Sequence, residues 1–315
     1  MGKYIVKRII SVIPVLFVVS IIVFSLLHLT PGDTASAILG TEASQEDINA
    51  LNHRLGLDKP IIIQYVDWIG NVFRGDFGTS VASNNEAVSS MIATHFKPTI
   101  ELAGYALMIS VFLALPLGML AAKFKGTVVD YGVSTVALLG ISLPSFLLGL
   151  GLMMLFAVKL RWFPVSGYKP WSAGIELHIK SLTLPAISLG FMYAAFMMRI
   201  TRASMLEVLN SDYIKMAKAK GVKESVIVTK HAFRNSLITV ITVIGQSLIG
   251  ALSGAVVVET LFGVPGMGSL IVNSIARRDY QVIQAVVLVM ALLNVSINLI
   301  VDLLYGIVDP RIRLE

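Results

Sequence analysis

Six long apolar stretches dominate this sequence, at residues 9–29, 99–122, 131–158, 181–198, 237–258 and 282–308. A helix that crosses the hydrocarbon core of a bilayer needs about 20 mainly apolar residues, because each residue adds about 1.5 Å of rise. A mean hydropathy of +0.80 with only 14% charged residues leaves more apolar surface than one water-soluble core could bury. The sequence therefore predicts an all-α polytopic membrane protein with six transmembrane helices.

The basic residues lie in short segments between these stretches, not on one soluble face. If the amino terminus is placed in the cytoplasm, 15 of the 25 lysine and arginine residues fall on the inner side. An excess of positive charge is typical of cytoplasmic loops. The pattern predicts that both termini lie inside. It also favours a lipid bilayer, and not nucleic acid, as the reason for the formal charge of +6.

The first apolar stretch has a second interpretation, as a secretory signal with a cleavage site at Ala35-Ser36-Ala37. Its length of about 20 residues exceeds the roughly 7–15 apolar residues of a signal peptide. Five further spans follow it and need their first partner. We therefore expect this stretch to stay uncleaved as a membrane helix.

This pattern divides the chain into four parts. Residues 1–30 form an amino-terminal cytoplasmic segment and the first span, 31–97 a small helical extracytoplasmic cap, 98–309 the membrane core with spans two to six, and 310–315 a cytoplasmic tail. In the cap, Ser44 and Asp47 begin a helix that Gly56 ends, and Pro60 opens a second, amphipathic helix that runs to Phe73. Such a cap could be a lid or a docking surface for a partner, and the sequence does not separate the two.

Several kinds of catalytic site are absent from the sequence. It contains no phosphate-binding GxxxxGK[ST] loop, no HExxH, no GxSxG and no cysteine. We therefore expect no catalytic residue, no metal site and no cofactor in this chain. The five histidines are scattered, which predicts isolated interfacial side chains. Glu101, Glu259 and His28 lie near the predicted outer ends of spans, where we expect water to reach them.

The longest inner loop, residues 199–235, has a helical composition. Ser211 or Asp212 can cap a short helix that runs to Lys220, and Gly221 supplies the left-handed residue that ends it. Residues 222–235 then resume as a helix that leads into the membrane. From spacing alone this loop could enter a cleft on another protein through its small residues at 217 and 219, or lie on lipid headgroups through its basic residues.

Residues 212–221 read DYIKMAKAKG and residues 231–235 read HAFRN. These runs resemble the coupling loop of ABC importer permeases, specifically the dipeptide and oligopeptide permease B-like members of the peptide/nickel branch. Lys215 stands where the general permease motif has Glu, although a basic residue there is usual in the peptide branch.

The resemblance extends almost from end to end. Ten further motifs resemble that branch and occur in the expected order: PGD at 31–33, LGLDKP at 55–60, GDFG at 75–78, PTIELA at 98–103, LPSF at 143–146, FPVSGY at 163–168, RITRASMLEVL at 199–209, VPGMG at 264–268, RRDY at 277–280 and NLIVDLLYGIVDPRIR at 298–313. Ten ordered motifs form a specific signal, whereas one alone would be weak.

The resemblance implies the type I ABC importer permease fold in a bacterial or archaeal cytoplasmic membrane. It also implies a second homologous permease subunit, two ABC ATPase subunits and an extracytoplasmic solute-binding protein as partners, with ATP and Mg used by the ATPases. The residues that it assigns to the ATPase-coupling loop are Tyr213, Ala217, Ala219, Lys220, Gly221, Arg234 and Asn235. The cargo implied is a di- or oligopeptide, with nickel, a nickel chelate or a glutathione-like solute as the alternative.

Polar side chains inside the spans are candidates for the translocation path. Asn294, Asn298 and Asp302 recur every four residues, which places them in one stripe of the sixth span. They could line the path, or they could join helices by hydrogen bonds. Gln246 and Ser142 are weaker candidates, and Pro144 with Gly140 is expected to kink the third span. The glycine-rich segment 259–268 predicts a tight turn, an external gate or a contact with the binding protein.

Two other functional classes fit less well. An ion-coupled secondary transporter predicts acids deep in several spans, and only Asp302 meets that condition. An intramembrane enzyme requires a catalytic pair at one depth, and none is evident.

Overall fold

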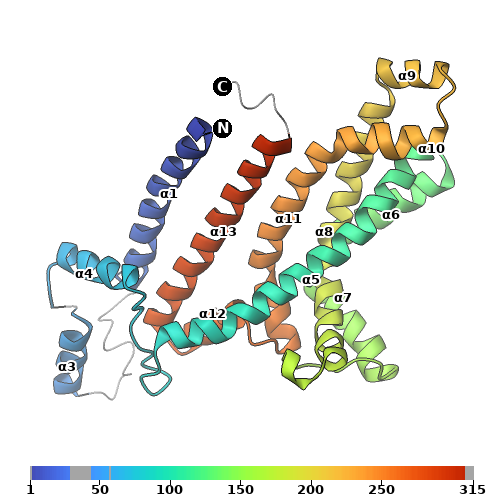
Figure 1. Cartoon of the computed structure of the whole chain (residues 1–315). Coiled ribbons are helices and arrows are strands. Elements are labelled where there is room, and N and C mark those ends of the chain that lie inside the picture. Colours follow the sequence, from blue (N-terminus) through green and yellow to red (C-terminus); the bar gives the residue numbers. More distant parts are fainter. Residues whose placement is uncertain (1, 29–43, 57, 309–315) are drawn as a thin grey trace. The chain divides into compact units, whose positions relative to one another are not determined.

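The protein is described here from a computed structural model that covers residues 2–28, 44–56 and 58–308. Helices make up most of these described residues, and Thr79 and Ala87 form an isolated antiparallel β-bridge. Figure 1 shows the helices in chain order. The chain forms two compact units, residues 1–97 with 266–296 and residues 98–265 with 297–315. Each unit is described by itself.

The described residues form the following helices. The α-helices are α1 (Gly2–His28), α3 (Gln45–Leu55), α4 (Ile61–Phe73), α5 (Val88–Lys123), α6 (Val128–Ser142), α7 (Ser145–Leu152), α8 (Ile175–Leu209), α9 (Asp212–Ala219), α10 (Glu224–Val226), α11 (Phe233–Phe262), α12 (Met267–Ala276) and α13 (Tyr280–Val308). Two π-helical segments are η1 (Met153–Lys159) and η3 (Ile227–Ala232), and η2 (Trp171–Ala173) is a 3₁₀ turn.

The predicted spans match this set of helices. Within the described residues, α1, α5, α8, α11 and α13 are each long and apolar enough to cross a membrane, and α6 with α7–η1 makes a sixth span if the bent pair counts as one. Both α5 and α8 extend well beyond the predicted stretches. Hydropathy marks only the apolar part of a helix, and a helix can continue into more polar sequence beyond it.

The third predicted span is two helices with a break between them. The axes of α6 and of α7–η1 meet at 103°. Leu143 is extended, with φ −86° and ψ 121°, and Pro144 stands at the start of α7. Proline disfavours the helical conformation in the preceding residue and has no N–H for the helix ladder. The expected kink is therefore a full break, and a single helix over 131–158 is wrong.

The larger unit is built around α8, which packs against α11, α6 and α7. Small residues allow these helices to approach closely. A Cβ on Gly140 would lie 2.6 Å from the Cβ of Ala195, and a Cβ on Gly190 would lie 2.6 Å from the carbonyl oxygen of Ala106. Close approach through small residues is typical of helix packing in membranes, where lipid is as apolar as the side chains.

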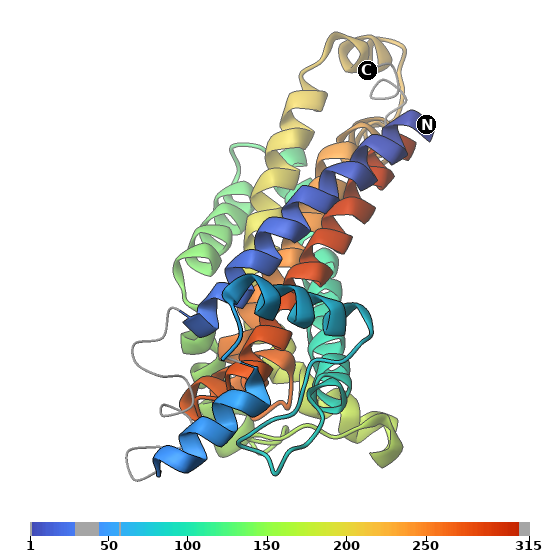
Figure 2. The ribbon, with the colours of Figure 1, turned by 90° about the vertical axis from the view of Figure 1, so that its left-hand side faces the viewer.

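The smaller unit joins α1, the cap helices, the start of α5, α12 and the first part of α13. Its core contains Val88, Met267, Leu270, Val282, Ala285 and Val286. Figure 2 shows α4 lying across the end of α1. There the Tyr65 hydroxyl lies 2.7 Å from the Ser20 hydroxyl, and the Phe24 ring lies 5.4 Å from Tyr65 and 5.8 Å from Trp68. Aromatic contacts and one hydrogen bond thus attach the cap to the first span.

The first cap helix begins and ends where the sequence predicts. The hydroxyl oxygen of Ser44 accepts the backbone N–H of Asp47, and Gly56 takes the left-handed conformation with φ +68°. The short helix α12 was not predicted, because its ten residues are too few to register as a membrane span. In the larger unit, the glycine-rich segment that precedes α12 begins as a tight turn at Gly263, with φ +62°.

Candidate functional site

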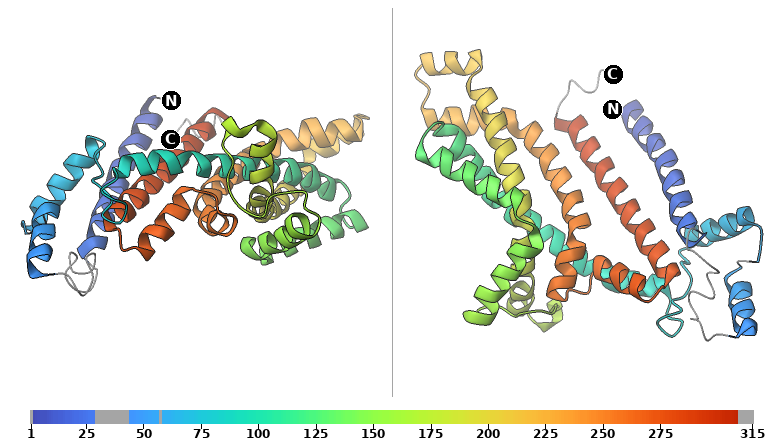
Figure 3. Two further views of the ribbon diagram at one scale, coloured as in Figure 1. Left: turned by 90° about the horizontal axis from the view of Figure 1, so that it is seen from below. Right: turned by 180° about the vertical axis from the view of Figure 1, so that it is seen from behind.

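The helix α9 links α8 to α11 at one end of the larger unit. Figure 3, right, shows it bridging the ends of these two long helices. Asp212 in its first turn interacts favourably with the helix dipole. The hydroxyl of Ser211, at the amino-terminal cap, donates to the carbonyl oxygen of Val208 and leaves the α9 amides to other partners.

The carboxyl end of α9 is a Schellman turn. The Gly221 N–H donates to the Lys218 carbonyl at 2.9 Å, and the Val222 N–H donates to the Ala217 carbonyl at 3.2 Å. Gly221 has φ +76°, a conformation that side chains with a Cβ rarely adopt. This turn fixes the direction in which the chain returns toward the membrane helices.

One face of α9 is anchored and the other is exposed. Ile214 is fully buried, while Met216 has 61% of its surface exposed and Ala219 is also exposed. Ile214 therefore belongs to the anchored face of α9 and is not available to a partner protein. The Tyr213 hydroxyl accepts a hydrogen bond from the Asn235 side-chain amide and donates a longer one to the His231 carbonyl at 3.4 Å.

The other predicted coupling residues surround this anchor. Ala217 is half-buried, and Lys220, Gly221 and Arg234 are exposed. Among the described residues, neither Lys220 nor Arg234 makes a side-chain hydrogen bond, whereas the Asn235 amide donates to the Tyr213 hydroxyl. An exposed strip that carries Met216 and Ala219 is thus presented on a helix that is tied to α11 through Tyr213.

The helix α9 packs against the π-helical turn η3. The η3 residues Val228 and Ala232 pack in one buried cluster with Ala122 of α5 and Met205 of α8. A π-helical turn changes the rotational phase of a helix and is frequent at functional sites. Movement of α9 would therefore reach α5, α8 and α11 through direct packing.

Beside this end, an ion pair joins α6 to α8. Arg202 donates to both carboxylate oxygens of Asp130, Nε to Oδ1 at 2.5 Å and Nη2 to Oδ2 at 2.8 Å. The Gly126 N–H in the α5–α6 turn also donates to Oδ2. Sequence reasoning missed this pair, although an acid next to a predicted span and an arginine in the inner loop were the available signals.

The residues predicted for the translocation path lie on three elements. The Ser142 hydroxyl donates to the carbonyl oxygen of Leu138 in its own helix. Gln246 on α11 and Asn298 on α13 are exposed, and Asp302 is partly buried. Within the described residues, no hydrogen bond joins Ser142, Gln246 and Asn298. The side-chain oxygen of Asn294 is buried, and it has no partner among the described residues.

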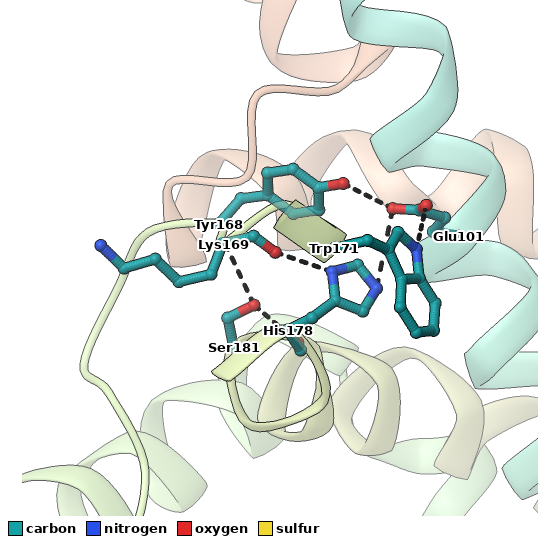
Figure 4. A network of polar contacts seen from close by, with 6 residues as sticks. All are labelled: Glu101, Tyr168, Lys169, Trp171, His178 and Ser181. Carbon is teal, nitrogen blue, oxygen red and sulfur yellow. Dashed lines mark hydrogen bonds and ion pairs between the residues drawn. The ribbon is translucent and has the colours of Figure 1, made fainter. Parts of the chain in front are cut away.

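A polar network joins α5, the loop before α8, and α8 (Figure 4). The carboxylate of Glu101 accepts the Tyr168 hydroxyl at 2.6 Å and the Trp171 indole N–H at 2.7 Å. Its Oε2 also lies 3.8 Å from Nε2 of His178, which is buried and stacked on Trp171. Burial and the nearby carboxylate raise the pKa of Tyr168 above its ordinary value, so it stays a donor.

Two expectations about outer-end residues are wrong. Glu259 was expected to meet water, but it is fully buried and accepts a 2.6 Å hydrogen bond from the hydroxyl of Thr99. His178 was expected to be isolated, but it belongs to the network with Glu101 and Trp171. Long-range packing buries both, because a carboxylate or imidazole with a hydrogen-bond partner loses less on leaving water. The side chain of His28 lies outside the described part of the chain. In that part, no group of three acidic or histidine side chains could hold a metal ion.

Comparison with known proteins gives consistent matches over the whole chain. Residues 114–314 match the family described as "Binding-protein-dependent transport system inner membrane component", and residues 1–103 match its amino-terminal counterpart. The chain is 41% identical over 313 residues to the "Probable peptide ABC transporter permease protein y4tP" of Sinorhizobium fredii, covering 99% of this chain and 100% of that protein.

Two further similar proteins have names that give other cargoes. The glutathione transport system permease protein GsiC of Escherichia coli (strain K12) is 41% identical over 313 residues, covering 99% of each chain. A solved structure of inward-facing conformations of the MetNI methionine ABC transporter aligns with a TM-score of 0.59 at 16% identity, covering 70% of this chain and 96% of that chain. The latter likeness shows the fold.

Proposed function

Because this chain belongs to the family of binding-protein-dependent transport system inner membrane components, we propose that it forms half of the translocation pathway of an ATP-driven importer of di- and oligopeptides. Its relatives are permease subunits and not enzymes. In this proposal the chain binds no cofactor itself, and two separate ABC ATPase subunits use ATP and Mg. A second, homologous permease forms the other half, and an extracytoplasmic solute-binding protein delivers the cargo.

The observation that carries the proposal is the way α9 is held. Its exposed strip, with Met216 and Ala219, is available to a cleft on an ATPase, while Ala217 is half-buried. Its anchored side, with Ile214 and the Tyr213–Asn235 hydrogen bond, ties the helix to α11. Closure of the ATPases would push α9, and tight packing leaves little slack, so α8 and α11 would rock between inward- and outward-facing states. In this arrangement α9 and both chain termini face the cytoplasm.

The contact with the ATPase can be tested by cross-linking, because the chain contains no cysteine. An Ala219→Cys variant places one thiol on the exposed strip of α9. A Glu176→Cys variant places it at the exposed start of α8 as a matched control. With a thiol cross-linker, Ala219→Cys should be joined to an ATPase subunit and Glu176→Cys should not. Equal cross-linking of both, or of neither, would contradict the assignment.

The coupling role can be tested at Gly221. A β-branched residue at φ +76° would distort the turn that ends α9. We expect Gly221→Val to reach the membrane at normal levels, while peptide uptake falls sharply and ATP hydrolysis no longer follows the binding protein. Gly174→Val carries comparable strain at φ +107° just before α8, at the end of that helix far from α9 in the chain, and should retain coupling. Unchanged uptake in Gly221→Val would count against the role of α9.

The cargo and its path form a separate part of the proposal. We assign Asn294, Asn298 and Asp302 to the path because their spacing places them in one stripe of α13. The polar side chains of Ser142 and Gln246, in α6 and α11, are the weaker candidates. The relative named for glutathione transport makes glutathione-like peptides the second candidate cargo. Uptake of labelled trialanine, with glutathione and Ni²⁺ as competitors, decides between them. Absence of trialanine uptake would reject peptide cargo.

A further inference from the structure

The smaller unit contains a cavity of about 460 Å³ between the cap and the α12–α13 turn. Ligand pockets in proteins typically measure roughly 300–1,000 Å³. The walls come from the end of α1, from α4, from the loop after α4, and from the start of α13. All these elements belong to one compact unit, so the unit itself fixes the shape of the cavity.

The aromatic wall of the cavity is rigid. Phe24 and Trp68 line it with ring centroids 5.8 Å apart. The Gln284 amide nitrogen, which also lines the cavity, donates to the backbone carbonyl oxygens of Val23 and Phe24, both at 3.2 Å. These contacts set the side chains in place before any ligand arrives, which lowers the entropic cost of binding.

The charge of the lining is unbalanced. It contains the carboxylates of Asp67, Asp76 and Asp279 but only one lysine, Lys59. That lysine is paired with Asp67 at 2.8 Å. Asp76 accepts the backbone N–H of Gly78 with one oxygen and is exposed at the rim. The lining histidine, His53, lies 2.8 Å from Asp58. Asp76 and Asp279 therefore remain beside the cavity without a cationic partner among the described residues.

Of these two carboxylates, Asp279 is the buried one, and it indicates which ligand the cavity would bind. Its side chain is only 4% exposed, and its Oδ2 accepts hydrogen bonds from the Ser80 hydroxyl and the Ala82 N–H. Its Oδ1 is buried and has no partner among the described residues. Burying a carboxylate without a cation costs free energy. The low dielectric around it also strengthens its electric field in the adjacent cavity. An ammonium group in the cavity would compensate this charge.

We propose that this cavity binds the amino-terminal ammonium group of a short peptide, with the first side chain against Phe24 and Trp68. The proposal rests on the peptide cargo proposed above and adds a second place where that cargo is held. The carboxylates of Asp279 and Asp76 supply the charge, and the aromatic rings supply the apolar contact. A weak site of this kind in the cap would hold a peptide after its release from the binding protein.

The test uses the whole transporter in nanodiscs without its binding protein. An Asn71→Cys variant places the chain's single thiol in the cavity lining, and an Asn49→Cys variant places it on an exposed part of α3 outside the cavity. Trialanine should slow maleimide labelling at position 71 and not at position 49. N-acetyl-trialanine, which lacks the ammonium group, should protect at least about tenfold less well. Equal protection by the two peptides, or none by either, overturns the proposal.

Charge variants identify the groups responsible. In the Asn71→Cys background, Asp279→Asn should raise the trialanine concentration for half protection about tenfold. Asp76→Asn, at the exposed rim, should raise this concentration by a smaller factor. It tests the role of negative charge in the cavity if Asp279→Asn does not fold. Glu46→Gln removes an exposed acid outside the cavity and should change nothing. Loss of protection in Glu46→Gln, or full protection in both aspartate variants, contradicts the site.

Uptake of labelled trialanine separates this proposal from the proposed function. If cells import trialanine but the peptide never protects position 71, the cap site is wrong and the importer proposal stands. If trialanine is neither imported nor protective, peptide cargo fails and the site fails with it.

Discussion

Arg202 on α8 holds Asp130, in the first turn of α6, through two parallel hydrogen bonds of 2.5 Å and 2.8 Å. The carboxylate is nearly fully buried and the guanidinium is 29% exposed. A planar guanidinium matches a carboxylate in this geometry, and the Gly126 N–H donates to the same carboxylate. The pair therefore links the α5–α6 turn to the helix that leads into α9.

Replacing Asp130 by Asn should destabilise the protein by about 2–3 kcal/mol. The variant keeps the shape of the side chain, but it removes the charge and leaves Arg202 without its bidentate partner. The measurement is the thermal unfolding of the purified transporter. The variant should also weaken the response of transport to ATP, because the α5–α6 turn loses its connection to α8.

The matched comparison for this pair is a double-mutant cycle. Arg202→Gln alone should cost a similar amount, and the Asp130→Asn, Arg202→Gln double variant should cost clearly less than the sum. Strict additivity of the two single variants would show that the contact contributes nothing of its own.

Gly190 on α8 should not tolerate alanine. A Cβ at this position would lie 2.6 Å from the backbone carbonyl oxygen of Ala106, and backbone atoms cannot move aside as a flexible side chain does. Overpacking of this kind costs about 1–3 kcal/mol. The expected result is a lower melting temperature in the membrane-extracted protein, with α5 and α8 forced apart.

Gly104 on α5 provides the control, since a Cβ there would meet no heavy atom within 4 Å. Gly104→Ala should leave the melting temperature unchanged or raise it slightly, because alanine favours the helix more than glycine does. A larger loss at Gly104 than at Gly190 would contradict the packing described for α8.

Local signals in the sequence accounted for much of the fold. The helix α3 begins at Ser44 and ends at Gly56 because both caps act within a few residues of the chain. The break before α7 follows from Pro144 and the restriction that it places on Leu143. The spans were visible because lipid requires about 20 apolar residues in succession.

Contacts between distant residues could not be predicted in this way. Asp130 and Arg202 are separated by 72 residues, and Glu101 and Trp171 by 70. Hydrophobic periodicity sets which face of a helix is apolar, but it does not fix which helices become neighbours. The burial of Glu259 depends on Thr99 of α5 in the same way. For α9, periodicity left a protein cleft and lipid headgroups open as partners, and the proposal of an ATPase rests on the resemblance to known permeases.

Glu101→Gln should loosen the loop between η1 and α8. The carboxylate accepts hydrogen bonds from both Tyr168 and Trp171, and an amide offers only one accepting oxygen to these two donors. The expected loss of stability is about 1–3 kcal/mol, measured by thermal unfolding. The tryptophan fluorescence of the variant should also shift toward longer wavelength as Trp171 gains contact with water.

Glu176→Gln is the matched control, because this exposed acid pairs only with Lys180 one turn along the same helix. Surface pairs of this kind contribute little. A shift of equal size in both variants would show that the Glu101 network has no special role.

The buried side chain of Ile214 holds α9 against the rest of the larger unit. Ile214→Ala removes a fully buried side chain beneath the helix, while Met216→Ala removes one that is 61% exposed on the other face. The first should cost about 2–4 kcal/mol of local stability, and the second should cost little. Hydrogen exchange at the α9 amides should therefore accelerate in Ile214→Ala and stay unchanged in Met216→Ala.

If α9 transmits force only while it is held rigidly, peptide uptake should fall in Ile214→Ala even though the whole protein remains folded in the membrane. Tyr213→Phe, which loses the hydrogen bond from Asn235, should show a smaller version of the same effect. Fast exchange with normal uptake in Ile214→Ala would mean that a loosely attached α9 is sufficient for coupling.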